Sequence, residues 1–81
     1  MKDVHGLRLR KLGELIKRER HSKNYTQQAL SELIDIDIRT LQRIEQGQLN
    51  ISINIFISLV NALNIDATEV IKKISDTTLE H

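Results

Sequence analysis

Apolar residues recur along most of the chain at intervals of three and four, the spacing of one face of an α-helix. The chain has no proline and only three glycines, so long strands joined by tight hairpins are not favoured. The pattern predicts an all-α fold with helices over residues 7–22, 27–34, 38–46 and 53–63, and a fifth from residue 67.

Residues that favour helix ends stand between these segments. Thr26, Asp37 and Ser52 are placed to cap the starts of helices, and residues 66–69 match a capping box at the last one. The helices are expected to end at Asn24, Gly47 and Asn64, because asparagine and glycine tolerate the left-handed backbone.

The 81 residues are enough for one domain. We expect a flexible N-terminal arm over residues 1–6, a folded body over 7–75 and a tail over 76–81, in which Leu79-Glu80-His81 resembles a histidine-tag remnant. There is no cysteine, no leader-like apolar run and no segment long enough to span a membrane, which favours the cytoplasm.

The second and third segments, separated by Asp35-Ile36-Asp37, have the length and spacing of a helix-turn-helix, whose second helix enters the DNA major groove. On a helical wheel the third segment has two sides. The core side is expected to carry Thr40, Leu41, Ile44 and Glu45; the outer side is expected to carry Ile38, Arg39, Gln42 and Arg43.

These outer residues suit the reading of bases. Arginine pairs with guanine through two hydrogen bonds, glutamine does the same with adenine, and isoleucine contacts the thymine methyl. A solvated helix face is the alternative interpretation. Charge adds weak support, since residues 1–47 hold ten Lys and Arg against seven Asp and Glu, whereas residues 48–81 hold two against four.

A second group of residues is placed to contact phosphates. The candidates are Thr26, Gln27, Thr40, Lys17 and Arg18. Thr26 and Gln27 stand at a helix N-terminus, where side chains and free N–H groups can meet an anion. A plain cap for Thr26 and solvated surface for the two cations are the alternatives.

The last two helices have more apolar residues than one small core requires. We expect a homodimer through Ile51, Ile55, Ile57, Val70, Ile71 and Ile74. The alternative is that some of these side chains complete the core of one protomer.

Nothing in the sequence favours catalysis. His5, His21 and His81 are scattered, without a carboxylate pair, a nucleophile or a glycine-rich phosphate loop. Asp35 and Asp37 are too few oxygen ligands for a metal. We therefore expect no enzymatic activity, no metal or other cofactor, and no small-molecule ligand.

From Leu12 to Ile71 the chain resembles the phage-repressor or Cro-like helix-turn-helix family, also called the xenobiotic-response-element family. The resemblance is carried by residues 12–16, Arg20, residues 25–31, residues 40–47, and residues 52–53 followed by 59–63. The chain departs from the family pattern at Asp35, where glycine is common, at Ile51, where proline is frequent, and at the unusually apolar Ile38.

The resemblance implies a compact five-helix, lambda-repressor-like domain with helices 2 and 3 as the helix-turn-helix. It implies a phosphate contact for Gln27, base-facing positions at Ile38, Arg39 and Arg43 with Gln42 beside them, and an ion pair between Arg20 and Glu45.

The implied function is sequence-specific binding of double-stranded DNA and transcriptional regulation, as a repressor that acts as a dimer on a two-fold operator. A phage repressor, a restriction–modification controller, an antitoxin and a stand-alone regulator all fit, and the small size suits a controller well. The alternative is a protein-binding module of the same fold, of an antitoxin or anti-repressor kind.

Overall fold

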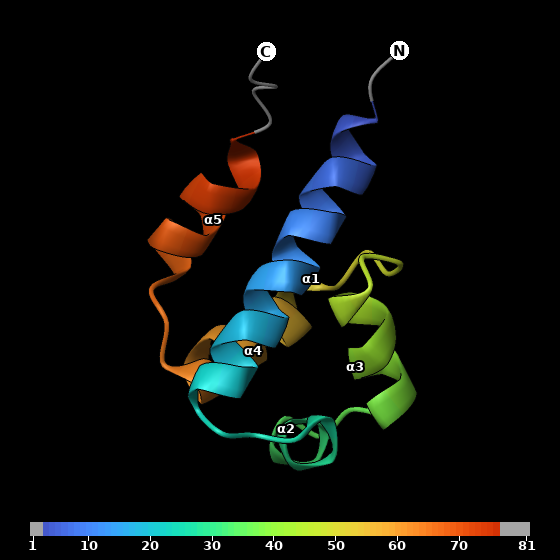
Figure 1. The fold of residues 1–81 in the computed structure, drawn as a ribbon, viewed down its shortest axis with the longest axis vertical. Coiled ribbons are helices and arrows are strands. Elements are labelled where there is room, and N and C mark those ends of the chain that lie inside the picture. The colour runs from blue at the N-terminus through green and yellow to red at the C-terminus, as the bar shows by residue number, and fades with distance from the viewer. Residues whose placement is uncertain (1–2, 77–81) are drawn as a thin grey trace.

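The computed structural model describes residues 3–76, and within that range every regular element is a helix. The five helices are α1 (Val4–Ser22), α2 (Gln27–Leu33), α3 (Ile38–Glu45), α4 (Ile53–Leu63) and α5 (Ala67–Ser75). The long helix α1 contacts α3, α4 and α5, and in Figure 1 α3 and α5 lie on opposite sides of it. The expected all-α fold is confirmed.

The residues predicted to cap the helix starts do so. The hydroxyls of Thr26 and Ser52 accept hydrogen bonds from the N–H groups three residues on, at 3.0 and 3.2 Å. The carboxylates of Asp37 and Asp66 accept from the N–H groups two residues on, so Asp66 caps α5 through the Thr68 N–H and not through the capping box predicted with Glu69. A left-handed backbone occurs at Asn24, Asp35, Gly47 and Asn64, with φ between 53° and 73°. Asp35 therefore adopts the conformation that glycine would adopt more easily at this turn.

The N-terminal boundary was predicted wrongly. Residues 4–6, assigned to a flexible arm, form the first turn of α1, because the Asp3 carboxylate accepts a hydrogen bond from the Gly6 N–H at 2.9 Å. Helices α2 and α3 each end one residue earlier than expected, at Leu33 and Glu45. The expected tag remnant, residues 79–81, lies outside the described residues.

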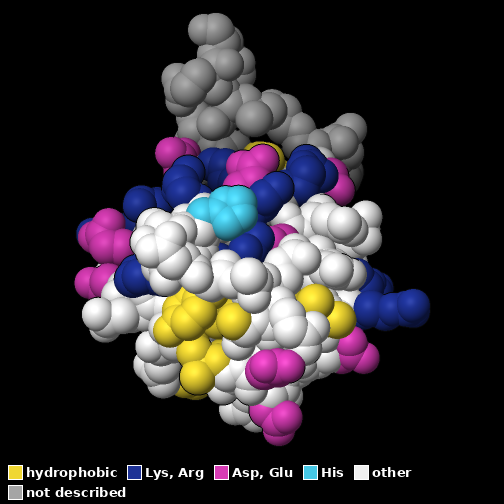
Figure 2. All heavy atoms as spheres, turned by 60° about the horizontal axis from the view of Figure 1, so that its bottom comes forward, with side chains coloured by type: hydrophobic (Ala, Val, Ile, Leu, Met, Phe, Trp, Pro, Cys, Tyr) yellow, Lys and Arg dark blue, Asp and Glu magenta, His cyan; other side chains and the backbone are white. Residues whose placement is uncertain are grey.

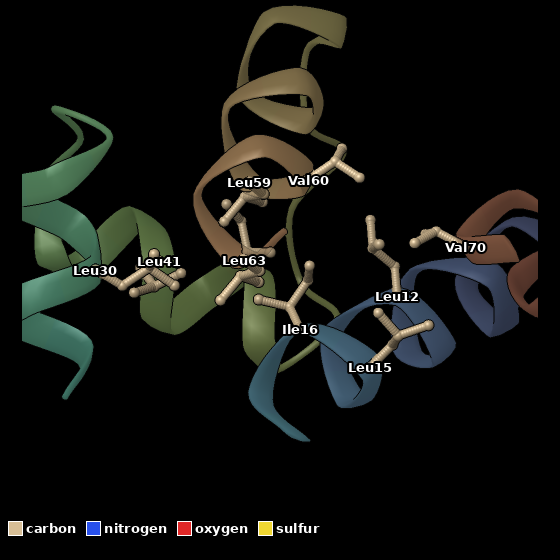
Figure 3. Close-up of a cluster of buried hydrophobic side chains, with 10 residues drawn as sticks. Leu12, Leu15, Ile16, Leu30, Leu41, Leu59, Val60, Leu63 and Val70 are labelled. Atoms are coloured by element: carbon tan, nitrogen blue, oxygen red, sulfur yellow. The ribbon is translucent and has the colours of Figure 1, made fainter. Parts of the chain in front are cut away.

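The core joins all five helices. Its buried apolar members are Leu12, Leu15, Ile16, Leu30, Leu41, Ile44, Leu59, Val60, Leu63 and Val70. Figure 3 shows Leu30 of α2 and Leu41 of α3 at one end of this cluster, Val70 of α5 at the other, and the labelled side chains of α1 and α4 between them. Because α2 is only seven residues long, its position depends on this shared core rather than on its own stability.

Helices α1 and α3 approach each other closely at Gly13. A Cβ atom on this buried residue would lie 2.5 Å from the carbonyl oxygen of Ile44 and 2.7 Å from that of Glu45. Both obstacles are backbone atoms at the end of α3, so they cannot rotate away as a flexible side chain would. Gly13 therefore sets how closely α3 packs on α1.

We predict that Gly13→Ala lowers the free energy of unfolding by about 1–3 kcal/mol, as overpacking does in other cores. Chemical denaturation of this variant and of Glu14→Ala, an exposed neighbour on the same helix, measures the effect. A Gly13→Ala protein as stable as the Glu14→Ala control would contradict the tight crossing.

Candidate nucleic-acid interface

Helix α3 has an exposed outer side that carries two free cations. Arg39 and Arg43 are exposed, and neither guanidinium makes a hydrogen bond or ion pair with residues 3–76. Leu41, Ile44 and Glu45 are buried on the opposite side. The helix is thus anchored through one side and leaves two unpaired guanidinium groups on the other.

The remaining candidate residues of α3 lie at the edges of its outer side. Ile38 and Gln42 are half-buried, and they flank the two arginines on the side nearer Glu45. Thr40 is half-buried on the other flank, beside the buried Ile44. The four residues expected to face outward therefore share one surface, with the arginines at its centre.

The buried ion pair implied by the family resemblance is present. Arg20 of α1 donates from Nε to Oε2 of Glu45 at 2.7 Å and from Nη2 to Oε1 at 3.1 Å. Its Nη1 group donates to the Tyr25 carbonyl at 2.8 Å. With 6% and 8% of their surfaces exposed, Arg20 and Glu45 are shielded from water, and the pair joins α1 to the end of α3 and to the loop before α2.

A pair of glutamines extends this ion pair towards the surface. Gln27 Nε2 donates to Oε1 of Glu45 at 3.0 Å, and Gln42 Nε2 donates to Oε1 of Gln27 at 3.4 Å. Sequence reasoning placed Gln27 and Gln42 separately and missed the contact. They stand fifteen positions apart on different helices, so only the packing of α2 on α3 reveals it.

The two cations of α1 that were expected to contact phosphates, Lys17 and Arg18, lie on different sides of that helix. Lys17 is exposed, and it follows Gly13 by four residues and precedes Arg20 by three, so it shares the side of α1 that faces α3. Arg18 instead lines a hollow with Lys73 and Ile74 of α5. The phosphate contacts expected for Arg18 and Lys17 would therefore lie on different sides of α1, since one residue of helix rotates the side chain by about 100°.

Charges of both signs share the end of the molecule shown in Figure 2. Lys and Arg side chains form a band across it with Asp and Glu among them, and a hydrophobic patch lies below the band. Attraction of a polyanion would therefore depend on individually placed cations rather than on a uniformly basic face.

The apolar surface formed by α4 and α5 differs in part from the expected one. Ile57 and Ile71 are each 48% exposed, and Ile53, which was not among the residues expected there, is 67% exposed. An apolar groove of about 340 Å³ is lined by Leu9 and Leu12 of α1 together with Ile51, Ile53, Phe56, Ile71 and Ile74.

Four of the six residues expected at the dimer surface are covered to different degrees, among them Ile74, which is half-buried and packs against the core. Val70 is 3% exposed and belongs to the core, because it points from α5 towards α1, so its assignment to the surface was wrong. Ile51 and Ile55 are half-buried and pack against the core.

Residues 3–76 contain no group of three or more His, Asp or Glu side chains placed to hold a metal ion. Within the same residues, no helix has both the length and the apolar character needed to cross a membrane.

We predict that Arg20→Ala lowers the free energy of unfolding by roughly 3–5 kcal/mol, because it leaves the Glu45 carboxylate buried without its main partner. Lys23→Ala, which removes an exposed pair with Glu19 at 3.5 Å, is the control and should cost at most about 1 kcal/mol. Equal losses in the two variants, measured by thermal or urea unfolding, would contradict the structural role of the buried pair.

Comparisons with known proteins agree with this geometry. The chain is similar to the restriction-modification controller protein C.AhdI from Aeromonas hydrophila, whose crystal structure superposes with a TM-score of 0.72. The two sequences are 31% identical over a match that covers 76% of this chain and 94% of the controller. The clp gene regulator ClgR from Corynebacterium glutamicum shares the fold at 23% identity, with a TM-score of 0.79 over 85% of this chain and 73% of ClgR. No curated protein sequence matches the chain.

A helix-turn-helix family model matches residues 16–70, which include the whole of α2, α3 and α4. One of the two structural relatives is described as a restriction-modification controller and the other as a gene regulator. The chain belongs to the Cro/C1-type helix-turn-helix family of DNA-binding transcription regulators.

Proposed function

We propose that this protein reads a specific sequence of double-stranded DNA with α3, as a homodimer on a two-fold operator, and represses transcription there. The observation that carries the proposal is the pair of exposed guanidinium groups of Arg39 and Arg43, which have no partner among residues 3–76, on a helix whose opposite side is buried. A helix held in this way can enter the major groove, and its arginines can pair with guanine.

The other candidates take supporting roles in this proposal. Ile38 and Gln42 contact bases at the edge of the surface that Arg39 and Arg43 form. Thr26, Gln27, Thr40 and Lys17 contact phosphates around it, which positions the helix without reading sequence. Arg18 is not part of the proposal, because it lies on the α5 side of α1.

Dimerisation supplies the second half of the recognition. One α3 helix reads only a few base pairs, and two-fold pairing presents two such helices to half-sites about one helical turn apart. The exposed isoleucines of α4 and α5 offer an apolar surface, and α5 lies across α1 from α3 (Figure 1). A dimer formed there would leave the reading surface free.

Control of a restriction–modification system is the biological setting we favour. The likeness to C.AhdI supports it, because this chain spans 94% of that controller at 31% identity. The alternative function, docking of a partner protein on α3, rests on the apolar Ile38. That residue is half-buried, whereas the exposed centre of the surface is cationic, which favours DNA.

We predict that Arg43→Ala relaxes the preference at one base pair by about 1–3 kcal/mol, whereas Lys17→Ala weakens binding to all duplexes alike. Titration of both variants against a selected operator and its single-base-pair substitutions measures the two effects. Uniform weakening of every duplex by Arg43→Ala would overturn its assignment as a base-reading residue.

Salt distinguishes DNA from a protein partner. The logarithm of the association constant for DNA should fall linearly with the logarithm of salt concentration, with a slope of about 0.9 for each phosphate that the protein neutralises. Lys17→Ala removes one phosphate contact and should therefore reduce the slope by about 0.9. A slope near zero for the wild-type protein would argue for the partner-binding alternative.

For the dimer, we predict that Ile57→Lys raises the dissociation constant of the homodimer at least tenfold, because it places a charge in the apolar contact. Leu33→Lys is the matched control, since Leu33 is similarly exposed but belongs to α2. Sedimentation at tens of micromolar measures the masses, and a monomeric wild-type protein would refute the dimer.

A further inference from the structure

A continuous series of hydrogen bonds runs from the interior of the protein to the outer side of α3. It begins at Arg20, passes through Glu45 and Gln27, and ends at Gln42. The first two members are buried and the last two are half-buried. This series of hydrogen bonds therefore connects the buried Glu45 carboxylate to the Gln42 side chain on the outer side of α3.

The Glu45 carboxylate sets the direction of every hydrogen bond in this series. An amide side chain can turn by 180° with little change in shape, so its neighbours decide which way its donors point. The ionised carboxylate of Glu45 has no proton and can only accept. Gln27 must therefore present its NH₂ group to Glu45, which leaves Oε1 of Gln27 as an acceptor.

The orientation of Gln42 is fixed in the same way by Gln27. Because Gln27 offers its carbonyl oxygen, Gln42 must turn its own NH₂ group towards Gln27, as the 3.4 Å contact shows. One N–H of Gln42 is occupied in this way. Its second N–H and its Oε1 atom remain to face a ligand, as one donor and one acceptor in a fixed order.

We infer that Glu45, acting through Gln27, orients the amide of Gln42 so that this residue selects adenine. Adenine offers the matching N7 acceptor and N6 donor at its major-groove edge. The inference rests on the proposed function and gives Gln27 a second role, as a positioning residue for base recognition besides its phosphate contact.

The burial of the ion pair makes this orientation persistent. The two hydrogen bonds from Arg20, at 2.7 and 3.1 Å, hold both oxygens of the Glu45 carboxylate, so it cannot rotate to release Gln27. The neighbouring Gln28 takes no part in this series of hydrogen bonds, because its amide donates to Glu32 of the same helix at 2.6 Å. It therefore provides a control of the same residue type.

The test is a double-mutant cycle on base preference. Duplexes enriched from a random pool by the wild-type protein define an operator, and titrations against all substitutions of each base pair define the preference there. Gln42→Met should abolish the preference for adenine at one base pair, a loss of about 5- to 150-fold. Gln27→Met should reduce the same preference, and should have no further effect on it when Gln42 is already Met.

The control variant, Gln28→Met, should leave that preference within twofold of wild type. Thermal unfolding of all variants establishes that each is folded in the titrations. If Gln27→Met changes the affinity for the operator but not the preference at the base pair that Gln42 reads, the inference is overturned and the proposed function is not. A preference of Gln42 for a base other than adenine would have the same result, whereas failure to enrich any duplex would overturn both the inference and the proposed function.

Discussion

The buried ion pair between Arg20 and Glu45 fixes the arrangement on which the rest of the structure depends. It ties α1 to the end of α3, and a third hydrogen bond from Arg20 holds the loop that leads into α2. Two charges are costly to bury, and their mutual hydrogen bonds offset that cost only in one geometry. The pair thus contributes a defined position for α3 more than it contributes stability.

That position separates two surfaces. On one side of α1, the close approach at Gly13 and the ion pair hold α3 with its arginines outward. On the other side, α5 packs through Val70 and leaves Ile71 exposed next to the isoleucines of α4. Reading of DNA and pairing of protomers can therefore take place on one small domain without competing for the same residues.

Much of this could be predicted from the chain, because the signals are local. Capping residues and helical periodicity located all five helices, and the wheel of α3 separated its buried side from Arg39 and Arg43. The error at Val70 arose where tertiary packing decides. Val70 and its neighbour Ile71 have similar apolar character, yet only Val70 points to the core. The link between Gln27 and Gln42 has no local signal, since it depends on how α2 and α3 pack.

A nuclear magnetic resonance titration of the protein with its selected duplex, in which the Nε–H signals of the arginine side chains are followed, tests whether α3 reads DNA. We expect large shifts for Arg39 and Arg43, with little change for Arg20, whose guanidinium is already held by Glu45. Shifts confined to α4 and α5, with Arg39 and Arg43 unchanged, would contradict the assignment of α3 as the helix that reads DNA.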